Sequence, residues 1–195
     1  MNDEYGSWDA ISVAEAVEIF SSAPFNWWIT GGQALELHLG RSWRDHDDTD
    51  ISFRRVDGAA VRRFLLGWHI SVATEGVLSP WFGEPLSANL HQNNLWCKKT
   101  LEGTWCLDLT VSDGDDDEWI FRRDISLRVP WDQAVLRSPK GIPYLAPELQ
   151  LLYKSKDRRT KDDFDAAEVI PQLDIDRRNF LQNALPDQHA WRQFL

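Results

Sequence analysis

Apolar positions recur at two different periods along the chain, and together the two periods predict helices and strands. The capping box Ser12-x-x-Glu15 opens a stretch of helical spacing, which predicts a helix over residues 12–22. Helical spacing returns at 33–40, from Asp57 to Leu65, after Pro147, around Phe164–Ile170 and at 174–185. β-prone runs predict strands at 26–30, 49–53, 68–74, 94–99 and 104–112, and a weaker one at 119–122.

The order of these elements predicts a mixed α/β (α+β) fold that ends in a small helical tail. Strands and helices intermingle up to about residue 145, whereas the chain beyond Pro147 has only helical spacing. We therefore expect an α/β domain over 1–145 and a C-terminal helical segment over 146–195. Glu102-Gly103 is a turn signal and predicts that the strands on either side of it form a hairpin.

Charge and composition exclude several classes of protein. The 195 residues are 43% hydrophobic, which is too apolar for a disordered chain. The net charge of −10 argues against a nucleic-acid or anionic-membrane partner. No apolar run is long enough to span a bilayer and no signal peptide is recognisable, so we expect a cytoplasmic protein. Cys97 and Cys106 are expected as buried free thiols, with a hairpin disulfide as the alternative.

The most distinctive segment is acidic, with four aspartates in residues 45–50. Clustered carboxylates repel one another unless a cation lies among them. Strand alternation puts Asp48, Asp50 and Ser52 on one face and leaves the opposite, apolar face for the core. Two carboxylates on one face are the oxygen ligands that Mg²⁺ accepts beside phosphate oxygens and water.

Two further features suit phosphate chemistry. Asp108 stands on the polar face of an otherwise apolar strand, and a carboxylate there is costly unless it is exposed or paired. If this strand neighbours that of Asp48 and Asp50, three carboxylates can hold one or two divalent cations. Gly31-Gly32 lies between a predicted strand and a helix start, where glycines let the backbone approach a phosphate.

This order of motifs resembles the nucleotidyltransferase superfamily with the polymerase-β-like fold. It is most similar to the small bacterial aminoglycoside and lincosamide adenylyltransferases. The resemblance covers roughly residues 26–165 and is carried by Thr30-Gly31-Gly32-Gln33-Ala34-Leu35, Leu39-Gly40-Arg41, Arg44-Asp45-His46-Asp47-Asp48-Thr49-Asp50-Ile51, Tyr144-Leu145-Ala146-Pro147-Glu148, Lys154-Ser155-Lys156 and Arg159-Thr160-Lys161-Asp162.

The resemblance implies a nucleotidyltransferase fold, a mixed sheet flanked by helices, and an enzyme that uses Mg²⁺ with ATP as co-substrate. It implies that Asp48 and Asp50 bind Mg²⁺ and that Asp108 is a third metal ligand or the general base. The partners are then a nucleoside triphosphate and a small-molecule acceptor. The chain keeps only a short tail where drug-modifying relatives carry a larger acceptor domain, so the acceptor stays open.

The resemblance also assigns the nucleotide-binding residues. Thr30, Gly31 and Gly32 would contact the triphosphate, and Lys154 and Lys161 would approach its phosphates or close over the nucleotide. The alternative for the lysines is a solvated helix junction, which is usual for basic runs.

Other polar residues near these motifs can be explained by a structural role as well as by a functional one. Arg44 is a candidate for a phosphate contact or for an ion pair with Asp45 or Asp47, and His46 is expected to orient its loop. The acidic run 113–118 starts like a calcium-binding loop, but Glu118 replaces the glycine that such a loop requires, so a solvated hairpin tip is expected.

Three functions follow. The first is transfer of a nucleoside monophosphate, AMP from ATP, to a hydroxyl of an aminoglycoside- or lincosamide-type small molecule. The second is a toxin of the same fold that modifies tRNA or protein, against which the net charge argues. The third is a catalytically degenerate domain that serves as a nucleotide-binding or assembly module.

Overall fold

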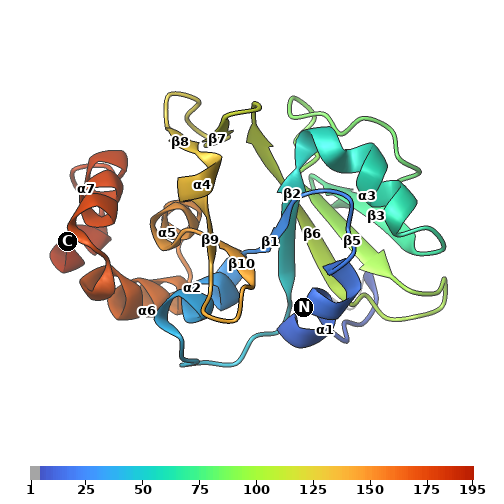
Figure 1. Cartoon of the computed structure of the whole chain (residues 1–195), viewed down its shortest axis with the longest axis horizontal. Helices are drawn as coiled ribbons and strands as arrows, with labels where there is room; N and C mark the ends of the chain where they lie inside the picture. Colours follow the sequence, from blue (N-terminus) through green and yellow to red (C-terminus); the bar gives the residue numbers. More distant parts are fainter. Residues whose placement is uncertain (1–4) are drawn as a thin grey trace.

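One ten-stranded mixed sheet runs through the molecule, and the computed structural model describes residues 5–195 (Figure 1). The main strand order is β4-β3-β5-β6-β2-β1-β10-β9, and β7 and β8 extend from the end of β6. The strands are β1 Trp27–Ile29, β2 Asp50–Arg54, β3 His69–Thr74, β4 Val77–Pro80, β5 Asn94–Lys98, β6 Leu107–Gly114, β7 Glu118–Ile120, β8 Arg128–Pro130, β9 Val135–Arg137 and β10 Pro143–Leu145.

Helices flank the sheet in two groups. In Figure 1, α1 and α3 lie toward one end of the molecule, while α6 and α7 gather at the other. The helices are α1 Val13–Phe20, α2 Gly31–Leu39, α3 Gly58–Phe64, α4 Trp131–Ala134, α5 Pro147–Lys154, α6 Thr160–Val169 and α7 Ile175–Ala184, with short 3₁₀ turns at Arg55–Asp57, Ile170–Gln172 and Ala190–Phe194. The last three α-helices make up the predicted helical tail.

Two apolar clusters hold these layers together. The first packs Phe20 of α1 and Val61 of α3 against the buried β2 residues Ile51 and Phe53. The second joins α2, α5, α6 and α7 around a set of fully buried side chains: Trp28, Leu35, Leu149, Leu151, Ala166, Leu181 and Trp191. Burial of this much apolar surface is the main favourable contribution to folding.

Most predicted helices and strands are confirmed, and local contacts determine where the helices begin and end. Ser12 and Glu15 form the reciprocal capping box, and Gly40 ends α2 in the left-handed conformation. The helix predicted at 33–40 begins earlier, at Gly31 itself. The 3₁₀ turn that precedes α3 places Asp57 just before the helix, but its side chain makes no capping hydrogen bond.

The prediction of a strand starting at residue 104 was wrong by three residues. Trp105 pairs with the N-terminal segment instead: its amide donates to the Ser7 carbonyl at 3.0 Å, and its own carbonyl accepts from Asp9 at 2.8 Å. β6 therefore begins at Leu107. The strands β4, β8, β9 and β10 went unpredicted, because runs of three or four residues are too short to show alternation.

Cys97 and Cys106 are both buried with free thiols, as predicted. No helix within residues 5–195 combines the length and the apolar character needed to cross a bilayer.

Candidate active site

Asp50 and Asp108 lie directly opposite each other at the start of two neighbouring strands. β2 and β6 pair in parallel, and their register places Asp50 against Asp108, Ser52 against Thr110 and so on to Arg54. The sequence could only suppose that these strands are neighbours, and the structure confirms it. Two carboxylates therefore share one edge of the central sheet.

The environment of this pair opposes full ionisation. Burial, followed by the charges of Asp108 and Asp48, raises the pKa of Asp50 well above its usual range. Burial also raises the pKa of Asp108 to about 7, although the Asn94 amide nitrogen donates to its two carboxylate oxygens at 3.1 and 3.3 Å and opposes the rise. Asp48 lies in the loop just before β2, and its charge adds to the rise at Asp108.

Gly31 is required by its contact with Asp50. Its φ is +70°, and an added Cβ would overlap the Asp50 carboxylate. The chain is held there by two hydrogen bonds: the Thr30 amide donates to the Asp50 carbonyl at 2.9 Å, and the Gly31 amide donates to Oε1 of Gln150 at 2.9 Å. The glycine turn therefore lies directly against Asp50 of the acidic pair.

Gly32 is required for a different reason. It is buried, and an added Cβ would overlap the guanidinium of Arg44 and the ring of His46. His46 in turn contacts Glu36 through Nε2 at 3.1 Å and Arg44 through Nδ1 at 3.2 Å. The expectation that His46 orients its loop agrees with these contacts.

Arg44 forms an ion pair with neither Asp45 nor Asp47, the partners that its own loop offers, and pairs with Asp165 instead. Its Nε and Nη2 donate to the two carboxylate oxygens of the fully buried Asp165 at 2.8 and 2.9 Å. Bidentate pairing of this kind fixes both position and orientation. Arg44 therefore ties the loop that carries Asp48 to helix α6, and its charge is already compensated.

Lys154 is similarly committed. Its Nζ lies 2.8 Å from Asp162 and 3.1 Å from Asp165, and the side chain is buried. Burial raises the pKa of Asp162, but hydrogen bonds from Arg159 and Lys154 outweigh it and hold the pKa far below its usual value. Lys161 is more open, since its ammonium lies 3.9 Å from Asp47.

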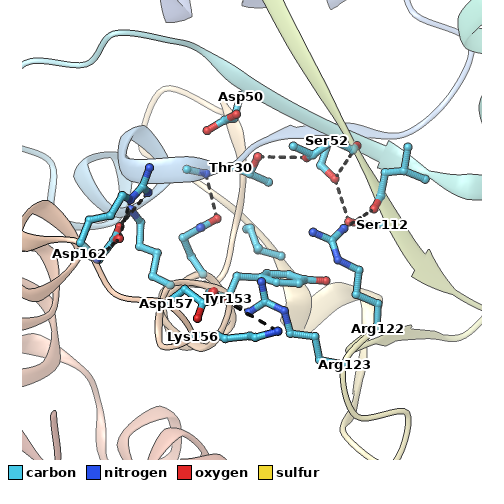
Figure 2. A pocket seen from close by; sticks show the side chains of 17 residues that line it. Thr30, Asp50, Ser52, Ser112, Arg122, Arg123, Tyr153, Lys156, Asp157 and Asp162 are labelled. Carbon is cyan, nitrogen blue, oxygen red and sulfur yellow. Dashed lines mark hydrogen bonds and ion pairs between the residues drawn. The ribbon is translucent and has the colours of Figure 1, made fainter. Parts of the chain in front are cut away.

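These groups border a cavity of about 290 Å³ between the sheet and the end of α5 (Figure 2). Three of the six predicted nucleotide-binding residues, Thr30, Gly31 and Lys154, line this cavity, whereas Gly32, Arg44 and Lys161 do not. Of the three predicted catalytic aspartates, Asp50 lines it and Asp48 and Asp108 do not. The lining residues are Thr30, Gly31, Asp50, Ser52, Thr110, Val111, Ser112, Arg122, Arg123, Leu145, Gln150, Tyr153, Lys154, Lys156, Asp157, Arg159 and Asp162.

Several lining residues were missed by sequence reasoning. Arg122 and Arg123 follow a strand that gives only a weak signal, and Tyr153 reads as part of an apolar helix face. Ser52 and Ser112 form a 2.8 Å hydroxyl contact on the floor. The alternation that singled out Asp50 already placed Ser52 on its face, which was the available signal.

The donor set at the acidic pair fits a hard divalent cation. Burial and neighbouring negative charge raise the pKa of both carboxyl groups, so a cation that neutralises them would stabilise their ionised forms. Across the part of the chain that the structure describes, no group of three or more His, Cys, Asp or Glu side chains stands preassembled around one point. The set offers two facing carboxylates, with Asp48 near enough to act on both electrostatically.

A mixed sheet with facing aspartates on parallel strands, and a glycine turn that opens a helix beside them, is the arrangement that the resemblance to nucleotidyltransferases implies. Residues 12–78 match the family model for aminoglycoside-2''-adenylyltransferase, a span that includes the glycine turn, Asp48 and Asp50. This match covers about a third of the chain and confirms the predicted resemblance to these adenylyltransferases. No curated protein matches the chain.

Solved structures confirm the fold. ANT(2'')-Ia in complex with adenylyl-2''-tobramycin is 16% identical, with a TM-score of 0.58 over 93% of this chain and 95% of that chain. The lincosamide adenylyltransferase LnuA with bound lincomycin is 20% identical, with a TM-score of 0.54 over 91% of this chain and 100% of that chain. A solution structure of ANT(2'')-Ia aligns with a TM-score of 0.55, at 17% identity over 88% of each chain.

Proposed function

We propose that this chain transfers AMP from ATP to a hydroxyl group of a small molecule, with Mg²⁺ as the metal. The observation that carries the proposal is the pairing of Asp50 with Asp108 beside the glycine turn at Gly31. Two solved structures of the same fold are described with adenylyl-2''-tobramycin and with lincomycin, and both are small molecules that bear hydroxyl groups. Their chemistry supports a small-molecule acceptor here.

The reaction is a displacement at the α-phosphorus. The acceptor hydroxyl oxygen forms a bond to that phosphorus, the bond to the pyrophosphate oxygen breaks, and the hydroxyl proton leaves to a base. Asp108 is the carboxylate that we assign as base, because it lies beside Asp50 where strands β2 and β6 begin. Catalysis of this step depends mainly on positioning and on electrostatic stabilisation.

Asp48 and Asp50 are the residues that would hold Mg²⁺, with Asp108 adjacent. A bound Mg²⁺ neutralises phosphate charge and polarises the phosphoryl group. The turn from Thr30 to Gly32 lies next to these carboxylates and suits the approach of phosphate oxygens to backbone amides.

The three basic residues take different roles in this proposal. Lys161 is half-exposed and only loosely paired, so it is free to approach a phosphate. Lys154 lines the cavity, where its charge lies close to Asp50 and lowers that residue's pKa against the larger effect of burial. Arg44 acts through position, because its guanidinium is bound to Asp165. We place the reaction in the cytoplasm, where free thiols such as Cys97 persist.

The test is release of pyrophosphate from ATP and Mg²⁺ with a panel of hydroxylated acceptors that includes tobramycin and lincomycin. We expect turnover with at least one acceptor, and its loss in Asp50→Asn. Asp116→Asn is the matched control, since that side chain is fully exposed and pairs only with Arg54. Equal ATP binding by the wild type and by Asp50→Asn would contradict the site, and absence of binding in both would favour a degenerate module.

A further inference from the structure

Arg122 and Arg123 stand in the cavity without an acidic partner. Neither forms an ion pair with any carboxylate of residues 5–195, although the chain carries a net charge of −10. Arg122 donates only to the Val111 carbonyl at 3.2 Å, and Arg123 only to the Tyr153 carbonyl at 2.8 Å. Two adjacent guanidinium groups with no counter-charge are costly to hold side by side unless an anion joins them.

Tyr153 adds a second unsatisfied group at the same place. The guanidinium carbons of Arg122 and Arg123 lie 4.9 and 5.7 Å from the centre of its ring. Its hydroxyl oxygen is buried and has no hydrogen-bond partner. In Figure 2 the hydroxyl end of Tyr153 points toward Arg122. A buried hydroxyl beside two unpaired arginines is the donor set of an anion site.

A larger cavity of about 990 Å³ meets the first one here. Arg122, Arg123 and Lys156 line both cavities and so form the wall between them. The one carboxylate of the larger cavity, Asp113, is already paired with Arg55 at 2.5 Å. On the side of the first cavity, Asp157 lies 4.0 Å from Lys156 and is the acidic group that acts on Arg123. One carboxylate therefore faces three cations, and the net charge at this junction is positive.

The cationic end is set apart from the acidic pair along β6. Val111, which Arg122 contacts, follows Asp108 by three residues, which is about 10 Å of strand. The hydroxyls of Ser52, Thr110 and Ser112 line the floor between. The triphosphate has its own partners at the other end, the glycine turn and Lys161. The cavity between Asp50, the register partner of Asp108, and the arginines thus suits a hydroxylated body of about monosaccharide size.

We propose that the acceptor carries an anionic group of the phosphate type, which Arg122 and Arg123 bind while an acceptor hydroxyl lies at Asp108. This inference rests on the proposed function and narrows its acceptor. In the reaction, the acceptor hydroxyl bonds to the α-phosphorus of ATP, pyrophosphate departs, and the proton passes to Asp108. The anionic group stays unchanged. A polycationic acceptor such as tobramycin is disfavoured, because its ammonium groups would face unpaired arginines.

The experiment compares sugars with and without a phosphate group. Binding of glucose 6-phosphate, glycerol 3-phosphate and inorganic phosphate is measured by calorimetry beside unmodified glucose and glycerol, and pyrophosphate release from ATP is measured with each. The variants are Arg122→Gln plus Arg123→Gln, with Arg122→Lys to retain the charge. Arg137→Gln is the matched control, since that exposed side chain bonds only to the Gly141 carbonyl.

We expect phosphorylated probes to bind more tightly than unmodified ones, and the double variant to lose at least tenfold in that affinity while its affinity for ATP stays within twofold. Arg122→Lys and Arg137→Gln should retain the preference. Equal binding of phosphorylated and unmodified probes by the wild type would overturn the proposal. A tenfold loss of ATP affinity in the double variant, with its affinity for the phosphorylated probes unchanged, would also overturn it and would assign the arginines to the nucleotide. Turnover with neutral or cationic acceptors alone overturns it while the adenylyl transfer stands.

Discussion

The α-carbons of Asp50 and Asp108 are register partners in the parallel ladder between β2 and β6. This pairing brings together two side chains that lie far apart in the sequence, at the point where both strands start. Burial then raises the pKa of both carboxyl groups, the charge of Asp108 adds to the rise at Asp50, and the charge of Asp48 adds to the rise at both. A site that holds carboxylates this close together favours the binding of a cation, because the cation neutralises their charge.

The first prediction concerns pH and stability without Mg²⁺. The pKa of Asp108 is about 7 in the folded chain against a usual value of 3.8, so the unfolded state releases this proton more readily. The free energy of unfolding should therefore rise as the pH falls from about 7 toward 4, through this group's contribution. Urea titrations across this range test it, and Asp108→Asn should flatten the dependence.

The second prediction concerns the effect of Mg²⁺ on thermal stability, which we expect to depend on the ionisation of the same carboxylates. Mg²⁺ binds the ionised form, so protonation competes with it. We expect Mg²⁺ to raise Tm more at pH 8 than at pH 5.5 in the wild type, and to have little effect on the Asp50→Asn, Asp108→Asn double variant. An equal rise in the double variant would show that the metal binds elsewhere.

Asp108→Asn separates catalysis from stability. Removing a general base lowers turnover by about 10²–10⁴-fold. The same substitution removes one of two repelling charges, so Tm at pH 8 should stay equal or rise. Steady-state kinetics beside a thermal melt provide the comparison. A variant that loses stability and activity in proportion would mean that Asp108 is a structural residue only.

Gly31→Ala tests the close approach at the turn. Gly40 is the matched position, because its φ of +68° is almost that of Gly31 at +70°, yet it has open space where a Cβ would stand. Gly40→Ala should lose about 1–2 kcal/mol from the left-handed backbone alone. Gly31→Ala should lose more and should also impair nucleotide binding, because the methyl group displaces the Asp50 carboxylate. Equal losses of unfolding free energy in the two variants would contradict this.

Asp165→Asn tests the buried ion network. Asp165 is fully buried and binds Arg44 and Lys154. Removing its charge leaves Arg44 without its carboxylate and Lys154 with Asp162 alone, and should lower the free energy of unfolding by about 3–5 kcal/mol. Asp116→Asn breaks an exposed pair and should change it by less than about 1 kcal/mol. Similar small effects in both variants would show that the network does not stabilise the fold.

The sequence predicted the acidic face well because strand alternation is a local property. The period of two placed Asp50 apart from Ile51 and Phe53, which the structure shows in the core. Arg122, Arg123 and Tyr153 could not be predicted as cavity residues, because the β7 excursion and helix α5 bring them there from separate parts of the chain. The pairing of Arg44 with Asp165 was missed for the same reason, since 121 residues separate the two.

A crystal structure with a non-hydrolysable ATP analogue and Mg²⁺ tests the central claim most directly. The account predicts electron density for a cation in contact with the carboxylates of Asp48 and Asp50, beside Asp108, with the triphosphate against the turn at Gly31 and Gly32. A nucleotide bound away from these residues, or a cation held by other side chains, would contradict it.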